Sequence, residues 1–154
     1  IIETQTSLEE MEAALDGATE AGAPIIIASM AYDLVKEGTD FRTMMGVSPE
    51  EAAALISSKG ADVIGTNCGS GIDIASAARI VSRYRDACTL PVMAQPNAGQ
   101  PEMQRDRIVY RETPQQMAEG VRLLVDAGVS IVGSCCGTTP EHVNLFRREL
   151  DSIS

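Results

Sequence analysis

Five short apolar segments, each followed by a stretch with helical features, are the strongest constraint on how this chain can fold. The segments are rich in Val and Ile and are apolar on both faces; they occupy residues 1–2, 24–30, 61–66, 91–94 and 129–132. Strands of this kind are typical of a parallel sheet whose faces are covered. The pattern therefore predicts an α/β domain built from five βα units.

Helix start signals follow four of these segments. Ser48 and Thr113 are each followed by Pro and, at the third helical position, by Glu or Gln, which is the pattern of a capping box. Ser7 has Glu10 at that position, whereas Thr139 is followed by a proline but has no acid there. Glycines that suit the residue after a helix end three of the stretches: Gly22, Gly60 and Gly128.

Charge and apolar content exclude several classes of protein. The chain has 154 residues, 12 Lys plus Arg against 22 Asp plus Glu, and a formal net charge of −10. Such an acidic chain is unsuited to binding nucleic acid or an anionic membrane surface. No apolar run approaches the roughly 20 residues that span a bilayer, and no signal-peptide pattern is present. With only 4 cysteines, we expect a cytoplasmic protein with reduced thiols.

Two architectures fit five βα units. The first is a flavodoxin-like, doubly wound sheet of five strands, which suits a chain of this length. The second is an incomplete (β/α)₈ TIM barrel, because the complete fold needs about 250 residues. Periodicity alone does not separate these two folds.

Three cysteines are predicted to meet at the carboxyl edge of the sheet. Cys68 closely follows the third apolar segment, and Cys135 and Cys136 closely follow the fifth. Three protein ligands with an open fourth position are typical of catalytic zinc, and thiolates select zinc or copper(I). The alternative is a flavodoxin-like binding or signalling domain whose cysteines are buried structural residues, as we expect for Cys88. Spacing leaves both interpretations open.

Five motifs along the chain match, in order, the motifs of one known family. They are Ile2-Glu3-Thr4, Ala28-Ser29-Met30, Gly65-Thr66-Asn67-Cys68, Gln95-Pro96-Asn97-Ala98-Gly99, and Gly133-Ser134-Cys135-Cys136-Gly137-Thr138-Thr139-Pro140-Glu141-His142. This set resembles the homocysteine S-methyltransferase family, most specifically in the double cysteine followed by Gly-Thr-Thr-Pro. The sequence departs from the family at Ser134, where a second glycine is usual, and at Gln95, where a charged residue is common.

The resemblance implies a fold and a boundary. Residues 1–154 would be the C-terminal portion of one homocysteine-binding (β/α)₈ barrel domain, covering about the fourth to eighth βα units. The N-terminal half of the barrel would then be missing from this sequence. By the resemblance we expect the segment to be inactive alone, because part of its substrate pocket lies elsewhere.

The resemblance also implies the chemistry. Zn²⁺ would be held by Cys68, Cys135 and Cys136, and would activate the thiol of homocysteine for methylation to methionine. Glu3, Ser29 and Asn97 would bind the substrate, with Glu3 meeting its amino group; no residue beyond the metal site is expected to be catalytic. The resemblance leaves the methyl donor open: the family uses methylcobalamin carried by another domain or protein, S-methylmethionine, S-adenosylmethionine or betaine. An alternative is a zinc methyltransferase that acts on a different thiol.

Three further features have structural interpretations. His142, the only histidine, lies in the first turn of a predicted helix and is expected to be structural. Residues 69–71, Gly-Ser-Gly, are interpreted as the turn that lets Cys68 reach a metal, because no complete phosphate-binding motif is present. Arg105 and Arg107 are expected to be solvated charges.

Overall fold

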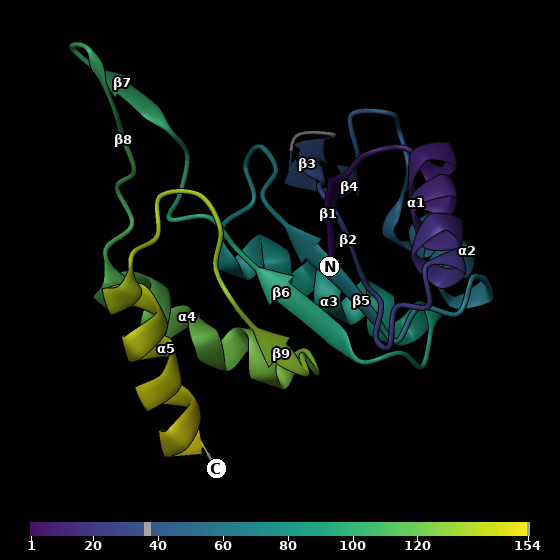
Figure 1. Ribbon diagram of the computed structural model, residues 1–154. Helices are drawn as coiled ribbons and strands as arrows, with labels where there is room; N and C mark the ends of the chain where they lie inside the picture. The colour runs from purple at the N-terminus through teal and green to yellow at the C-terminus, as the bar shows by residue number, and fades with distance from the viewer. Residues whose placement is uncertain (36–37, 154) are drawn as a thin grey trace.

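A parallel sheet forms the centre of the computed structural model, which describes residues 1–35 and 38–153. The sheet has five strands in the order β1-β2-β5-β6-β9 (Figure 1). The strands are β1 (Ile2–Gln5), β2 (Ile27–Met30), β5 (Val63–Asn67), β6 (Val92–Gln95) and β9 (Ile131–Val132). All four pairings between them are parallel, which confirms the predicted α/β class.

The strand order follows the order of the chain. A doubly wound sheet reverses its strand order at a switch point, and this sheet has no such reversal in the described residues. The flavodoxin-like alternative is therefore wrong.

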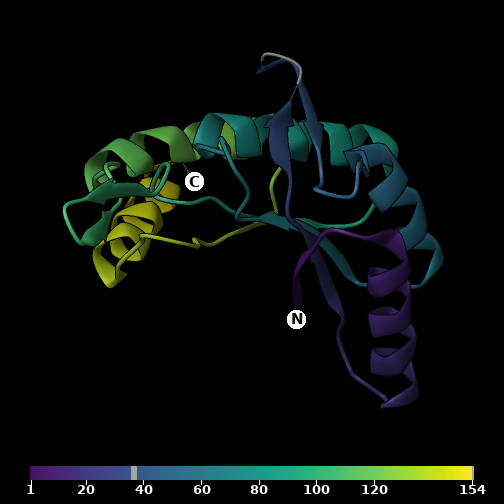
Figure 2. The same cartoon turned by 90° about the horizontal axis from the view of Figure 1, so that it is seen from above.

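In Figure 2 the first four helices form an arc along the outer, convex side of the sheet. The helices are α1 (Leu8–Glu20), α2 (Pro49–Ser58), α3 (Ile74–Ala87), α4 (Pro114–Asp126) and α5 (Pro140–Ile153).

The sheet is strongly curved. Gln95 at the end of β6 donates a hydrogen bond to the Glu3 carboxylate on β1, at 3.0 Å, although β2 and β5 lie between these strands. In a flat sheet the two strands would be about 14 Å apart, beyond the reach of both side chains. The contact therefore requires a curved sheet, whose concave side faces away from α1 to α4 (Figure 2).

The core lies between the convex side of the sheet and the helices. Two buried tyrosines, Tyr32 and Tyr84, share a hydrogen bond between their hydroxyl groups at 2.7 Å. Aliphatic side chains from strands and helices fill the rest, among them Met11, Leu15, Ile64, Ile80, Val92, Val121 and Leu124. The core thus fixes the sheet from one side and leaves the strand ends free to build a site.

The helix starts agree with the sequence in most details. Ser48 and Thr113 form complete capping boxes with Glu51 and Gln116. The Ser7 hydroxyl accepts from the Glu10 amide but donates to Glu9, so the reciprocal half of that predicted box is missing.

The capping role at the start of α5 falls to His142. Its Nδ1 accepts a hydrogen bond from the Thr139 amide at 3.0 Å, and its Nε2 lies 3.3 Å from the Glu112 carbonyl oxygen. The ring therefore serves as the acceptor that a glutamate usually provides. Both ring nitrogens have backbone partners, which agrees with the structural role expected for this residue.

Two strand-to-helix connections contain hairpins that the sequence pattern did not predict. One is formed by β3 (Asp33–Val35) and β4 (Asp40–Arg42), the other by β7 (Glu102–Gln104) and β8 (Arg107–Val109). The β7–β8 hairpin projects away from the sheet in Figure 1, with Arg105 and Arg107 exposed as expected. Among the described residues, no helix has the length and apolar character needed to cross a membrane.

Candidate metal centre

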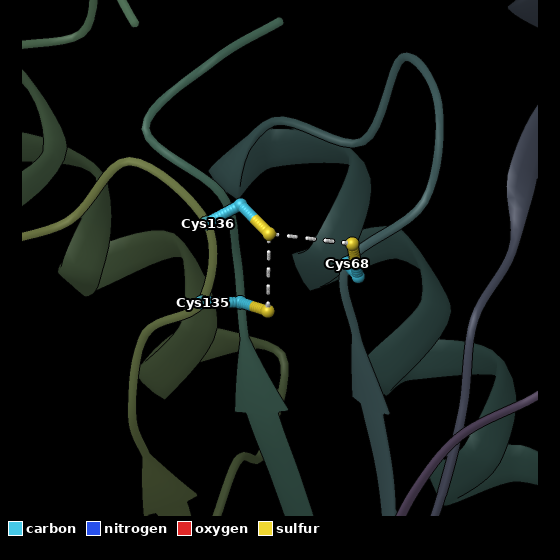
Figure 3. Close-up of side chains that lie close together, drawn as sticks. All are labelled: Cys68, Cys135 and Cys136. Carbon is cyan, nitrogen blue, oxygen red and sulfur yellow. Dashed lines mark hydrogen bonds between the residues drawn. The ribbon is translucent and has the colours of Figure 1, made fainter. Parts of the chain in front are cut away.

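The three predicted thiols lie together at the carboxyl edge of the sheet (Figure 3). Cys68 follows β5, and Cys135 and Cys136 follow β9; β6 lies between these strands in the sheet. The Cys136 sulfur is 3.8 Å from that of Cys68 and 3.9 Å from that of Cys135. All three sulfurs lie within 4.8 Å of one another. Cys88 caps the end of α3 and is not part of this cluster.

The cluster has the donor chemistry and spacing of a zinc site. Zinc–sulfur bonds of about 2.3 Å in a tetrahedron place neighbouring sulfurs about 3.8 Å apart, close to the distances of 3.8 and 3.9 Å from Cys136 to the other two sulfurs. Three soft donors would also leave a fourth position for a substrate atom. The residues present therefore fit the zinc ion that the family resemblance implies.

A left-handed turn brings Cys68 into the cluster. Cys68 has φ 58° and Gly69 has φ 96°, a conformation that non-glycine residues rarely adopt. A Cβ atom at Gly69 would overlap the carbonyl oxygen of Tyr32. The turn thus depends on a glycine that lets two backbone segments come into contact.

Asn67 joins three strands beneath the thiols. Its Oδ1 accepts from the Thr4 amide at 3.0 Å and from the Ser29 hydroxyl at 2.7 Å. Its Nδ2 donates to the Thr4 hydroxyl at 2.8 Å and lies 3.9 Å from the Cys135 sulfur. Ser29, predicted to bind substrate, is fully buried here and supports Asn67. Asn67 is part of the Gly65-Thr66-Asn67-Cys68 motif, but the sequence alone does not indicate this role.

Asn97 links the two loops that carry the thiols. Its Oδ1 accepts from the Cys136 amide at 3.1 Å, and its Nδ2 donates to the Gly69 carbonyl at 3.3 Å. The same Nδ2 lies 3.9 Å from the Cys68 sulfur. This buried side chain therefore fixes the distance between the two halves of the cluster. Its predicted contact with substrate stays a prediction.

The protonation of Cys135 is set by its surroundings. Burial raises the pKa of its thiol to about 11, and the neighbouring thiols add to this effect, while the hydrogen bond from Asn67 opposes it. Without a cation the Cys135 thiol is therefore protonated at neutral pH. A bound cation would reverse this balance because it favours the thiolate.

A cleft of about 340 Å³ opens next to the cluster. Its walls include Cys68 and Cys136 and residues from the base of the β7–β8 hairpin; the full lining is Cys68, Gly69, Ser70, Asn97, Gln100, Pro101, Tyr110 and Cys136. The Tyr110 ring lies directly against Gly137, where an added Cβ would overlap it. The sequence does not indicate that Gln100 and Tyr110 line a site, because both lie in the long connection between β6 and α4, which has no periodicity.

A curved parallel βα sheet with three thiols at its carboxyl edge defines the class: an α/β domain with a cysteine site able to hold a metal. The chain belongs to the homocysteine S-methyltransferase family, whose model matches residues 1–150. This confirms the resemblance carried by the motifs.

Similar proteins include two methionine synthases, from Mycobacterium leprae (strain TN) and Mycobacterium tuberculosis (strain ATCC 25618 / H37Rv). Each is 31% identical in an alignment 149 residues long that covers 93% of this chain. The chain spans 12% of the length of each of these relatives. Most of each relative therefore has no counterpart in this sequence.

Proposed function

We propose that this chain supplies the zinc site and part of the thiol-binding cleft of a homocysteine S-methyltransferase. The observation that carries the proposal is the three-thiol cluster, formed from two strand ends in a chain of that family. We also propose that residues 1–154 are the C-terminal portion of a (β/α)₈ barrel. The sequential strand order and the contact between Glu3 and Gln95 across the concave side support this proposal.

In this proposal Cys68, Cys135 and Cys136 hold the metal. When bound, zinc supplies a Lewis acid that favours the deprotonated form of a substrate thiol. Asn67 and Asn97 orient the cysteine sulfurs with their amide hydrogens. The cleft beside Cys68 and Cys136 gives the substrate thiol access to the cysteine sulfurs.

The reaction is a methyl transfer to sulfur. The substrate sulfur forms a bond to the methyl carbon, the bond between that carbon and the donor breaks, and the donor keeps the electron pair. The thiol proton passes to solvent. Glu3 accepts a hydrogen bond from the substrate ammonium group, a charge-assisted contact. The methyl donor belongs to another module, for which the likeness to methionine synthases supports a corrinoid carrier.

X-ray absorption at the zinc edge tests the proposed thiol acceptor. Adding homocysteine to the zinc-loaded, full-length protein is expected to raise the sulfur coordination from about three to about four, because the thiol fills the open position. Homoserine, which has a hydroxyl in place of the thiol, is the matched control and should leave the spectrum unchanged. No spectral change with homocysteine would refute the proposal. A change only with another thiol, such as 2-mercaptoethanesulfonate, would favour the different acceptor.

Zinc affinity is expected to fall as the pH is lowered. The Cys135 thiol has a pKa of about 11 without metal, so it must release a proton to become a ligand at any lower pH. For each proton that is released when zinc binds, the affinity falls about tenfold when the pH is lowered by one unit. The dissociation constant should therefore rise at least tenfold per unit as the pH falls from about 8 to 6. Competition with a chelating dye at several pH values measures this slope. An affinity independent of pH would contradict thiolate ligation by Cys135.

A further inference from the structure

The carboxylate of Glu3 on β1 has a hydrogen-bond partner on β6, although β2 and β5 lie between these strands in the curved sheet. Gln95 Nε2 donates to Glu3 Oε1 at 3.0 Å. Glu3 is exposed and lies on an edge strand of the described sheet, where a free carboxylate would sample several rotamers. The amide of Gln95 therefore restricts where the charge of Glu3 lies.

Gln95 is itself tightly held. Its Cγ is so close to Gly133 that a Cβ there would lie 2.9 Å from it. Its Oε1 is buried and has no hydrogen-bond partner among the described residues. The amide orientation that donates to Glu3 thus places an unpaired carbonyl acceptor beside that carboxylate. Leaving such a buried carbonyl without a hydrogen bond costs free energy.

The Glu3–Gln95 pair lies beside the thiol cluster. Thr4, the next residue after Glu3, is bonded through both its amide and its hydroxyl to Asn67, which reaches Cys135. Gly133, which accommodates Gln95, comes two residues before Cys135. A small thiol bound at the cluster would therefore have the pair within its vicinity.

The neutrality of Gln95 determines what the pair can recognise. An amide orients the carboxylate without cancelling its negative charge, whereas Lys or Arg at this position would form an ion pair with Glu3 and compete with a cationic ligand. We propose that Gln95 is a positioning residue that holds Glu3 so that the site selects thiols carrying an ammonium group. This inference rests on the proposed function of the thiol cluster.

Binding of two thiols to the zinc-loaded, full-length protein tests the inference. The probes are homocysteine and 4-mercaptobutanoate, which has the same thiol and carboxylate but no amine. The parent protein should prefer homocysteine. Gln95→Ala should reduce that preference about five- to tenfold, which is the effect of one ordinary hydrogen bond, with zinc content and 4-mercaptobutanoate affinity unchanged. Gln95→Lys should reduce it at least as much. Gln104→Ala, on the exposed β7–β8 hairpin, is the matched control and should match the parent.

A double-mutant cycle separates positioning from a general structural role. In the Glu3→Gln background, Gln95→Ala should cause no further loss of preference, because it acts through Glu3. A parent protein that binds neither thiol at its metal would refute the proposed function. A parent that prefers homocysteine, with Gln95→Ala retaining the full preference or weakening both thiols equally, would overturn this inference alone.

Discussion

Replacing Cys136 with serine is expected to remove most of the zinc that the protein binds. Cys136 lies between the other two thiols, 3.8 Å from Cys68 and 3.9 Å from Cys135, so its loss leaves two soft ligands and one weak hydroxyl. Loss of outer-shell partners alone weakens metal sites about 10- to 100-fold, so loss of a ligand should cost at least about 100-fold. Metal analysis after gel filtration measures the zinc that remains.

Two control variants test whether the effect is specific to the cluster. Cys88→Ser changes a thiol at the end of α3, outside the cluster, and should retain zinc at the parent level. His142→Asn removes a ring whose nitrogens have backbone partners, and should also retain zinc. Equal zinc in Cys136→Ser and the parent would mean that the cluster is not the metal site.

Gly69→Ala is expected to unfold or strongly destabilise the region around Cys68. The new Cβ would overlap the Tyr32 carbonyl oxygen, and alanine is strained at the φ of 96° found here. Both effects act on backbone, which cannot move aside cheaply, so we expect a loss of about 3 kcal/mol or more in the free energy of unfolding. Chemical denaturation of the full-length protein measures this loss.

Gly17→Ala provides the matched comparison. Gly17 lies within α1, and an added Cβ there meets no atom within 4 Å. Alanine is favoured over glycine inside a helix, so this variant should be about 0.5–1 kcal/mol more stable than the parent. If Gly69→Ala were as stable as the parent, the close approach of the two backbone segments would not be needed for folding.

The local features of this fold could be predicted from the sequence. Val- and Ile-rich segments gave the five strands, and Ser48 and Thr113 were recognised as helix caps because their partners lie only three residues away. The thiol cluster was also predicted, since Cys68 and Cys135 both follow strands whose carboxyl ends meet at one edge.

Features that depend on sheet geometry could not be predicted. Periodicity does not encode strand order, so it cannot separate a doubly wound sheet from part of a barrel; the observed order β1-β2-β5-β6-β9 does. The contact between Glu3 and Gln95 depends on the curvature of four strands, and the role of Asn67 depends on three chain segments meeting. The hairpins were missed because their strands are three residues long and lack apolar alternation.

Because the final strand, β9, is short, local opening of the chain is coupled to ligand binding at the cluster. β9 is two residues long and pairs with Met93 and Ala94 of β6, whereas the strand before Cys68 has five residues and a neighbour on each side. The last βα unit is therefore the part of the sheet that can most readily detach as a cooperative unit. Any ligand that bridges Cys68 to Cys135 and Cys136 adds its binding free energy to the cost of that detachment. Occupancy of the cluster and slow hydrogen exchange in β9 are then two readouts of one equilibrium.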